Sequence, residues 1–195
     1  MNPCIGGVHD RQQRRARNRR GVRPAFLLSW LLLPALALAW GRWHAHHWRF
    51  PLHDALPDRT LTPGASSAAV TQANVRGTIC VRGYTRTVRP PEPYTERLKR
   101  EQIREYGYRD HWLRDYEEDH LIPLELGGSP TSPRNLWPQP RHVAGGWGAH
   151  RKDRLENQLN YLVCRGRLSL ATAQRAIATD WIAAYRRYIG TSRGW

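Results

Sequence analysis

The stretch from Tyr116 to Gln139 decides the fold. It reads Tyr116-Glu-Glu-Asp-His-Leu-Ile-Pro-Leu-Glu-Leu-Gly-Gly128, continues through a short Ser/Thr/Pro loop, and ends in Asn135-Leu-Trp-Pro-Gln139. An acid and a histidine stand side by side in its first half, and the Gly-Gly pair marks a chain reversal. The pattern therefore predicts a hairpin that returns Asn135 to the neighbourhood of the histidine.

Asp119 and His120 carry the groups that hydrolysis of a phosphodiester needs. Asp119 offers a hard oxygen ligand for a cation, and His120 offers a nitrogen base that titrates near neutral pH. Neighbours on a strand point to opposite faces, so a bend near His120 is needed for the two to share a task. The Asn135 amide could then fix the orientation and tautomer of the ring. These residues predict a metal-assisted phosphodiester hydrolase.

Four motifs in the chain resemble the HNH endonucleases, in particular a bacterial subfamily of them. They are Cys80-Val-x-Gly-Tyr-Thr-x-x-Val-Arg-Pro-Pro, Glu118-Asp-His-Leu-Ile-Pro-Leu-Glu-Leu-Gly-Gly, Asn135-Leu-Trp-Pro-Gln and Lys152-Asp-x-x-Glu. The resemblance covers residues 76–185. It implies an α+β fold, in which a small ββα-metal core of hairpin and helix is surrounded by flanking helices.

The resemblance also implies roles for three residues of the hairpin. Asp119 corresponds to the first metal ligand of the family, and His120 corresponds to its general base. Asn135 corresponds to the middle asparagine of the motif name. We expect His120 to deprotonate water while a cation held by Asp119 stabilises charge on the phosphate.

The second metal ligand is harder to place from the motifs. His150 is the best match to the final histidine of the family, but no Cys-x-x-Cys pair accompanies it here. His142 and Asp153 are therefore rivals for the same position. The expected cofactor is a divalent cation: Mg²⁺ or Mn²⁺ suits oxygen ligands, and Zn²⁺ or Ni²⁺ is favoured by more imidazole.

Other polar residues near the motif have two interpretations each. Glu118 could be a further metal ligand or an outward-facing surface acid. Lys152 and Glu156 are four residues apart in a helical pattern, which by itself predicts an ordinary surface salt bridge. The resemblance makes Lys152, Asp153 and Glu156 candidates for contacting phosphate or for bracing the hairpin.

The charge of the chain indicates a polyanionic partner. The 195 residues carry a formal charge of +15, and residues 76–195 hold 21 Lys and Arg against 13 Asp and Glu. DNA is the expected partner, with RNA as an alternative and no small-molecule cofactor. A different interpretation is a non-catalytic nucleic-acid-binding or envelope-associated domain that keeps the hairpin as a scaffold.

The N-terminal part has the organisation of an exported protein. Residues 1–24 are basic, residues 25–40 are apolar with small residues near their end, and residues 41–75 read as a linker before a nuclease domain at 76–190. The apolar run predicts either a cleaved secretory signal or an uncleaved membrane anchor. Either interpretation places the domain outside the cytoplasm, as a periplasmic, secreted or membrane-anchored protein.

The cysteines agree with export. Cys4 precedes the apolar run, which leaves Cys80 and Cys164 as a possible pair in the exported part. A disulfide between them would be worth roughly 4–5 kcal/mol by the chain-entropy estimate. The alternative is two separate buried thiols.

Apolar periodicity predicts three helices around the hairpin. One begins at Thr95 as its N-cap, one begins near Ala149, and one spans residues 170–188. The last is expected to be a packing element with Trp181 and Tyr185 on its inner face.

Overall fold

A computed structural model of the protein describes residues 50–190. The basic region 1–24, the predicted signal or anchor at 25–40 and the first part of the predicted linker lie outside the described residues. Within residues 50–190, no helix combines the length and the apolar character required to cross a membrane. These residues fall within one unit of the chain, which is the part discussed below.

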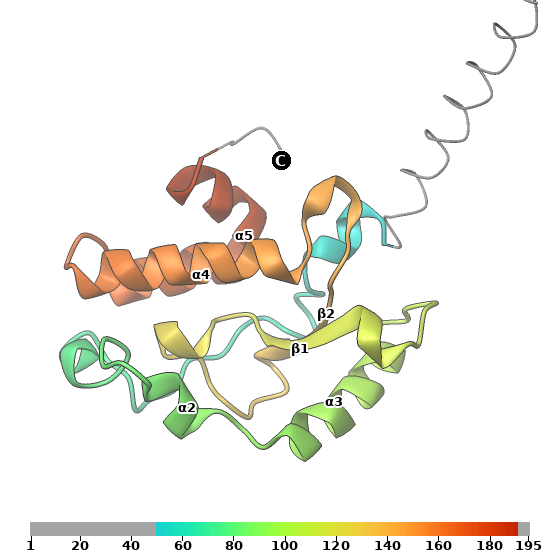
Figure 1. The fold of residues 1–195 in the computed structure, drawn as a ribbon, viewed down its shortest axis with the longest axis horizontal. Coiled ribbons are helices and arrows are strands. Elements are labelled where there is room, and N and C mark those ends of the chain that lie inside the picture. Colours follow the sequence, from blue (N-terminus) through green and yellow to red (C-terminus); the bar gives the residue numbers. More distant parts are fainter. Residues whose placement is uncertain (1–49, 191–195) are drawn as a thin grey trace, which may run out of the picture. The chain divides into compact units, whose positions relative to one another are not determined.

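An antiparallel hairpin lies at the centre of this part (Figure 1). Strand β1 spans Tyr116–His120 and strand β2 spans Leu136–Pro140. The register pairs Asp119 with Trp137, so the acid lies one residue before the end of the ladder. The hairpin predicted from the motif is confirmed.

The connection between the strands requires glycine at one point. A Cβ atom placed on Gly128 would lie 1.7 Å from the carbonyl oxygen of Ile122, a distance that no side chain tolerates. Since the obstacle is backbone rather than a flexible side chain, the loop closes tightly only with glycine there. The Gly-Gly pair therefore serves close approach of two backbone segments as well as chain reversal.

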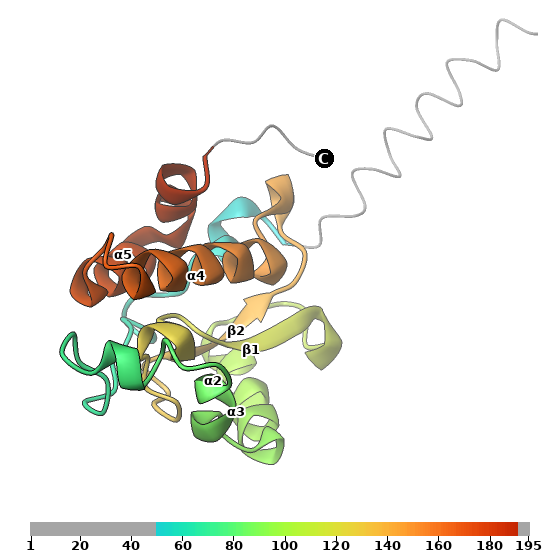
Figure 2. The ribbon, with the colours of Figure 1, turned by 60° about the vertical axis from the view of Figure 1, so that its left-hand side comes forward.

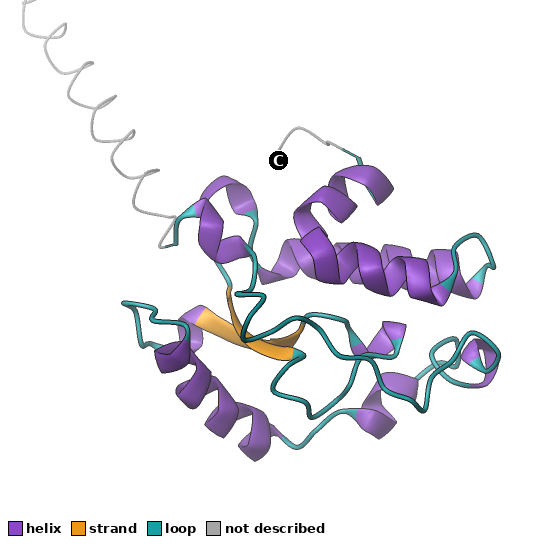
Figure 3. Cartoon of the chain, turned by 180° about the vertical axis from the view of Figure 1, so that it is seen from behind, coloured by secondary structure: helices purple, strands orange, loops and turns teal. Residues whose placement is uncertain are grey.

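Helices cover the hairpin from two sides (Figures 1 and 3). Helix α4, Ala149–Cys164, lies on one side, and helix α3, Glu92–Glu105, lies on the other with the short helix α2, Tyr84–Val88, before it. The described part also contains five short 3₁₀ helices: η1 Leu52–Ala55, η2 Val75–Gly77, η3 Leu113–Asp115, η4 Leu124–Leu126 and η5 Ala144–Gly146. The architecture is α+β, as the sequence predicted.

Helix α3 begins earlier than its sequence pattern indicates. The pattern predicts Thr95 as the N-cap, whereas the helix starts at Glu92 with Pro91 as the N-cap residue. Pro93 is tolerated in this first turn because the N–H that it lacks would have no partner inside the helix. The prolines therefore start the helix instead of delaying it.

Helix α5, Leu170–Tyr188, packs against α4 and changes direction within its length (Figure 2). At Asp180 the backbone is extended, with φ −163° and ψ 97°. The Asp180 carboxylate accepts a hydrogen bond from the backbone N–H of Ala183 at 2.9 Å, which is the geometry of an N-cap. The helix thus restarts after Asp180 and carries its last turns away from its first direction.

The predicted linker is wrong for residues 50–75, which belong to the folded core. Phe50, Ala55, Val70 and Val75 are all at least 95% buried. The Nε1 of Trp181 donates to the carbonyl oxygen of Ala55 at 2.7 Å. The prolines and serines of this stretch indicate irregular backbone, but irregular backbone can still lie against a core when single apolar residues are spaced along it.

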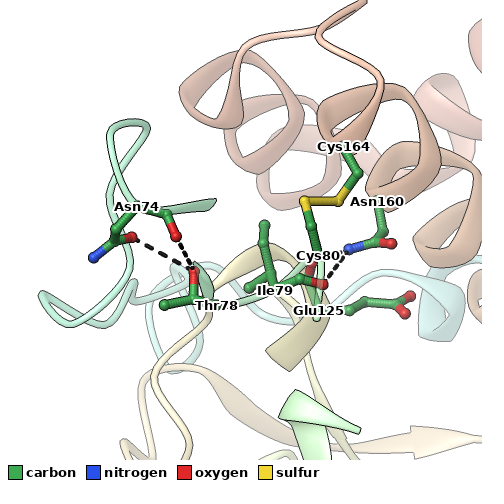
Figure 4. Close-up of a disulfide and its surroundings, with 7 residues drawn as sticks. All are labelled: Asn74, Thr78, Ile79, Cys80, Glu125, Asn160 and Cys164. Atoms are coloured by element: carbon green, nitrogen blue, oxygen red, sulfur yellow. Dashed lines mark hydrogen bonds between the residues drawn. A yellow bond between two sulfur atoms is a disulfide. The ribbon is translucent and has the colours of Figure 1, made fainter. Parts of the chain in front are cut away.

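The Cys80–Cys164 disulfide is present, with 5.6 Å between the two Cα atoms (Figure 4). It joins the C-terminal end of α4 to the turns that precede α2. One helical turn earlier, the Asn160 amide donates to the carbonyl oxygens of Ile79 at 3.2 Å and Glu125 at 2.7 Å. The end of α4 is therefore fixed both covalently and by hydrogen bonds to two separate loops.

Candidate active site

His120 ends β1, and the loop between the strands holds its ring. The ring Nε2 lies 2.9 Å from the carbonyl oxygen of Pro130. Because a carbonyl oxygen only accepts, this contact assigns the proton to Nε2 and the lone pair of the neutral ring to Nδ1. Burial lowers the pKa of His120, and the hydrogen bond to Pro130 opposes that effect only in part. The ring is therefore neutral at pH 7, in the tautomer of a base that acts through Nδ1.

Asn135 is completely buried and uses every hydrogen-bonding position of its amide. Its Nδ2 donates to the carbonyl oxygens of Ile122 and Ser129, both at 3.0 Å. Its Oδ1 accepts from the backbone N–H of Ile122 at 3.0 Å and of Ala65 at 3.2 Å. With two donors and two lone pairs occupied, the predicted contact with the His120 ring is not formed. Asn135 instead closes the loop that positions the ring.

Lys152 connects α4 to the end of β1. Its Nζ donates to Asp119 Oδ2 at 2.6 Å, to the carbonyl oxygen of His120 at 2.8 Å and to Glu156 Oε1. The side chain has no exposed surface. Burial by itself would lower the pKa of Lys152, but Asp119 and Glu156 raise it above its ordinary value, so the ammonium stays charged. The helical pattern predicted a surface salt bridge between Lys152 and Glu156. The pair is buried instead, and Lys152 also holds Asp119 and His120 in place.

Two further carboxylates lie near Asp119. Burial and then the charge of Asp119 raise the pKa of Asp153, and the same two causes raise the pKa of Glu117. Arg141 donates from Nη1 to Glu117 Oε2 at 2.7 Å. Asp119, Asp153 and Glu117 therefore form an acidic rim beside β1, partly neutralised by one arginine.

Glu118 is not the outward-facing surface acid that one of its two interpretations predicted. By the alternation of β1 it lies on the side opposite this rim, and Lys99 of α3 is the cation that most lowers its pKa. Both carboxylate oxygens are buried without a hydrogen-bond partner among the described residues. Burial raises the pKa of Glu118 to about 9, so without a bound cation this acid keeps its proton at neutral pH.

The two candidate histidines lie at the surface. The His150 side chain is 93% exposed, and its Nδ1 is 3.9 Å from Asp153 Oδ2. His142 is exposed in the segment that follows β2. Across residues 50–190, no three His, Cys, Asp or Glu side chains converge into a group that could hold a metal by themselves. The structure therefore brings Asp119 and Asp153 together with Lys152, while the imidazoles of His150 and His142 remain at the periphery.

Three features of the site have no clear signal in the sequence. The Pro130 acceptor is a backbone oxygen, so residue type does not reveal it. Glu117 is one of several acids before the motif, and Arg141 is one of many arginines. Only the alternation along β1 hints that Glu117 shares the side of Asp119 rather than that of Glu118.

No protein-family model, no curated protein and no solved structure matches this chain. The chemistry of the site must therefore be argued from its geometry and from the motifs.

Proposed function

We propose that this protein is a metal-dependent endonuclease of the HNH type that hydrolyses phosphodiester bonds in DNA or RNA. The observation that carries the proposal is the state of the His120 ring. The Pro130 carbonyl fixes the proton on Nε2, and burial keeps the ring neutral, which leaves Nδ1 as a basic nitrogen on the residue that follows Asp119. That is the state a general base must have to accept a proton from water at neutral pH.

The surrounding residues hold this base in place. Lys152 bonds both the side chain of Asp119 and the main chain of His120, so the two neighbours keep one relative orientation. Asn135 fixes the loop that supplies the Pro130 acceptor. Only 5% of His120 is exposed, so the attacking water must reach Nδ1 through a restricted approach. Such restriction favours a single attack geometry.

The carboxylate oxygens near Asp119 could supply some of the ligands of a hard divalent cation. Mg²⁺ is commonly bound by one or two carboxylates together with water and substrate oxygens, so it does not need three converging side chains. Asp119 with Asp153 is the carboxylate pair that the geometry offers, and His150 lies next to Asp153. When bound, such a cation would neutralise charge on the phosphate and the leaving oxygen.

The setting we propose is outside the cytoplasm. The Cys80–Cys164 disulfide supports it, because disulfides persist in oxidising compartments. The basic region and the apolar run before residue 41 support it as well. The nuclease would then act on nucleic acid that reaches the envelope or the exterior of the cell.

A nicking assay with supercoiled plasmid tests the activity. The full chain is assayed with Mg²⁺, Mn²⁺, Zn²⁺ and Ni²⁺, and each result is compared with a chelator control. His120→Gln keeps an amide that can donate to Pro130 but removes the base, and we expect at least a 100-fold loss of rate. His53→Gln changes a histidine whose side chain is 81% exposed and that is no candidate ligand, so it is the control and should keep the wild-type rate.

Two results would count against the proposal. If wild type fails to nick with every metal yet binds DNA, the chain is a binding domain that keeps the hairpin as a scaffold. If His120→Gln nicks at the wild-type rate, the base lies elsewhere. Circular dichroism and a melting curve on each variant separate these outcomes from misfolding.

A further inference from the structure

Three arginines gather over two aromatic rings where α4 begins and α5 ends. The guanidinium carbon of Arg151 lies 4.5 Å from the ring centre of Trp147 and 5.6 Å from that of Tyr185. Arg186 lies 5.2 Å from the Trp147 ring, and Arg154 lies 5.9 Å from the Tyr185 ring. We call Arg151, Arg154 and Arg186 the arginine surface. They come from two helices, so only the fold brings them together.

In the described part of the chain, no salt bridge neutralises the arginine surface. Among residues 50–190, the ion pairs join other groups, and none involves Arg151, Arg154 or Arg186. Arg151 also lies in the first turn of α4, where the partial positive charge of the helix end disfavours a cation. The positive charges at this place repel one another and are attracted to an external anion.

The guanidinium groups are held in position before any ligand arrives. The Trp147 ring contacts Trp181 edge-on at 5.8 Å and Tyr185 at 5.6 Å, so the ring is braced by α5. Arg151 donates from Nη1 to the carbonyl oxygen of Gly145 at 3.2 Å. Stacked and bonded guanidinium groups lose little freedom when they bind an anion, which favours affinity.

The break in α5 is what completes this arrangement. Because the helix restarts after Asp180, its last turns leave the direction of the preceding ones (Figure 2). Those turns carry Tyr185 against Trp147 and place Arg186 beside the same ring. A groove of about 490 Å³ continues from here between Arg154 and Tyr188. Arg154 therefore lines the groove as well as contacting the aromatic cluster.

We infer that the arginine surface binds the phosphodiester backbone of nucleic acid. The identity of the polyanion rests on the proposed function. Several fixed cations over aromatic rings are the features by which proteins track such a backbone. Arg151 directly precedes Lys152 on α4, but its side chain contacts Trp147 and Tyr185 whereas that of Lys152 contacts Asp119, so the arginine surface is distinct from the candidate active site.

An anionic membrane surface is the competing ligand for a basic face. A helix that lies on a membrane buries large apolar side chains in the lipid. The large apolar residues that are well exposed in the described part lie outside the arginine surface: Leu52, Val81, Trp112 and Tyr161. The aromatic rings of the cluster are instead covered by arginines and by each other, which favours nucleic acid.

Fluorescence anisotropy with a labelled DNA duplex tests the inference. The full chain is titrated in the presence of a chelator, so binding is read without cleavage, at KCl from about 50 to about 200 mM. Arg151→Gln/Arg186→Gln should weaken binding about 10-fold or more and lower the salt slope by about 1 for each phosphate that the variant no longer neutralises. The basic residues before Pro24 are present in every variant, so only differences between variants are interpreted.

Arg165→Gln is the matched control. Arg165 also stacks on an aromatic ring, that of Tyr161 at 5.4 Å, but at the opposite end of α4. It removes one charge and one stacked pair, and its effect on affinity should be below about 2-fold. Arg186→Gln alone, at an exposed position, gives a second variant if the double variant melts early.

Two outcomes would overturn the inference. One is equal affinity and equal salt slope for Arg151→Gln/Arg186→Gln and Arg165→Gln. The other is unchanged DNA binding with lost binding to phosphatidylserine vesicles, which would assign the surface to membrane. A failure of the nicking assay leaves both interpretations unaffected, because no cleavage enters the measurement.

Discussion

The two faces of α4 differ in whether their positive charges have carboxylate partners. Lys152 faces the hairpin, has no exposed surface, and is surrounded by Asp119 and Glu156. Arg151, the residue before it, faces α5 and has no carboxylate partner among the described residues. A buried charge must be paired because water no longer solvates it, whereas a partly exposed charge can stay unpaired at little cost. The difference separates a cation that organises the protein from cations available to a ligand.

Removing the buried cation is expected to have the largest effect. Lys152→Met leaves Asp119 and Glu156 without their ammonium, and the free energy of unfolding should fall by about 3–5 kcal/mol. Arg151→Met removes a cation one residue away and should change it by about 0.5 kcal/mol or less. Urea denaturation of both variants measures the two values. Equal losses would show that the two faces do not differ as described.

Lys152→Arg sharpens the same comparison. It keeps the charge but brings a larger planar group into a site that has no spare room. We expect a stability between those of Lys152→Met and wild type. A stability equal to wild type would show that charge alone matters at this position, independent of shape.

The disulfide should contribute a somewhat smaller amount to both faces alike. Cys80→Ser/Cys164→Ser releases the C-terminal end of α4 and should lower the free energy of unfolding by roughly 3 kcal/mol, less than the chain-entropy estimate of roughly 4–5 kcal/mol because the unfolded chain retains some structure. Because Lys152 and Arg151 lie at the other end of the helix, the difference between their Met variants should persist in this background. Urea denaturation checks it, and a difference that disappears would mean that the disulfide positions the first turns of α4.

Glu118 extends the comparison to a buried acid that has no cation bonded to it. Its pKa of about 9 lies above that of an unfolded chain, so the folded state keeps a proton that the unfolded state releases. The contribution of Glu118 to the free energy of unfolding is fully present below about pH 4.5 and is lost as pH rises toward 9. Glu118→Gln should therefore be more stable than wild type by a few kcal/mol at pH 8 and equal to it at pH 4.

Glu117→Gln is the control for that pH dependence. Glu117 precedes Glu118 on β1 but reaches Arg141 at the surface. The pKa of Glu117 is also raised by burial and by Asp119, but less than that of Glu118, so its replacement should add less stability at pH 8. If both variants behave alike in urea denaturation at the two pH values, burial of Glu118 is not the cause.

The sequence predicts the elements whose residues repeat with a clear period or carry a specific motif. The hairpin follows from the residues around Gly128, and the C-terminal helices follow from apolar spacing. The Cys80–Cys164 disulfide is one of the two alternatives that the cysteine count allowed. These features depend on local chemistry, which a single sequence records directly.

The sequence does not reveal features that depend on backbone groups or on distant neighbours. Residues 50–75 look like a linker because their buried residues are isolated among polar ones. The break at Asp180 depends on a carboxylate that caps the restarted helix, within a stretch that otherwise has helical periodicity. Lys152 and Glu156 have surface-helix spacing, and only the approach of β1 buries them. Tertiary contact overrides local pattern in each of these cases.

The hydrogen bond from Trp181 to the carbonyl oxygen of Ala55 sets a limit on proteolytic maturation. The backbone N–H of Ala144 likewise donates to Phe50, at 3.0 Å. A mature form that kept these anchors would have to be cut before Phe50. A protease acting inside residues 50–55 would detach the support of Trp181, and with it the ring on which Trp147 rests. If the N-terminal region is removed, the cut must therefore lie before Phe50 for the arginine surface to be retained.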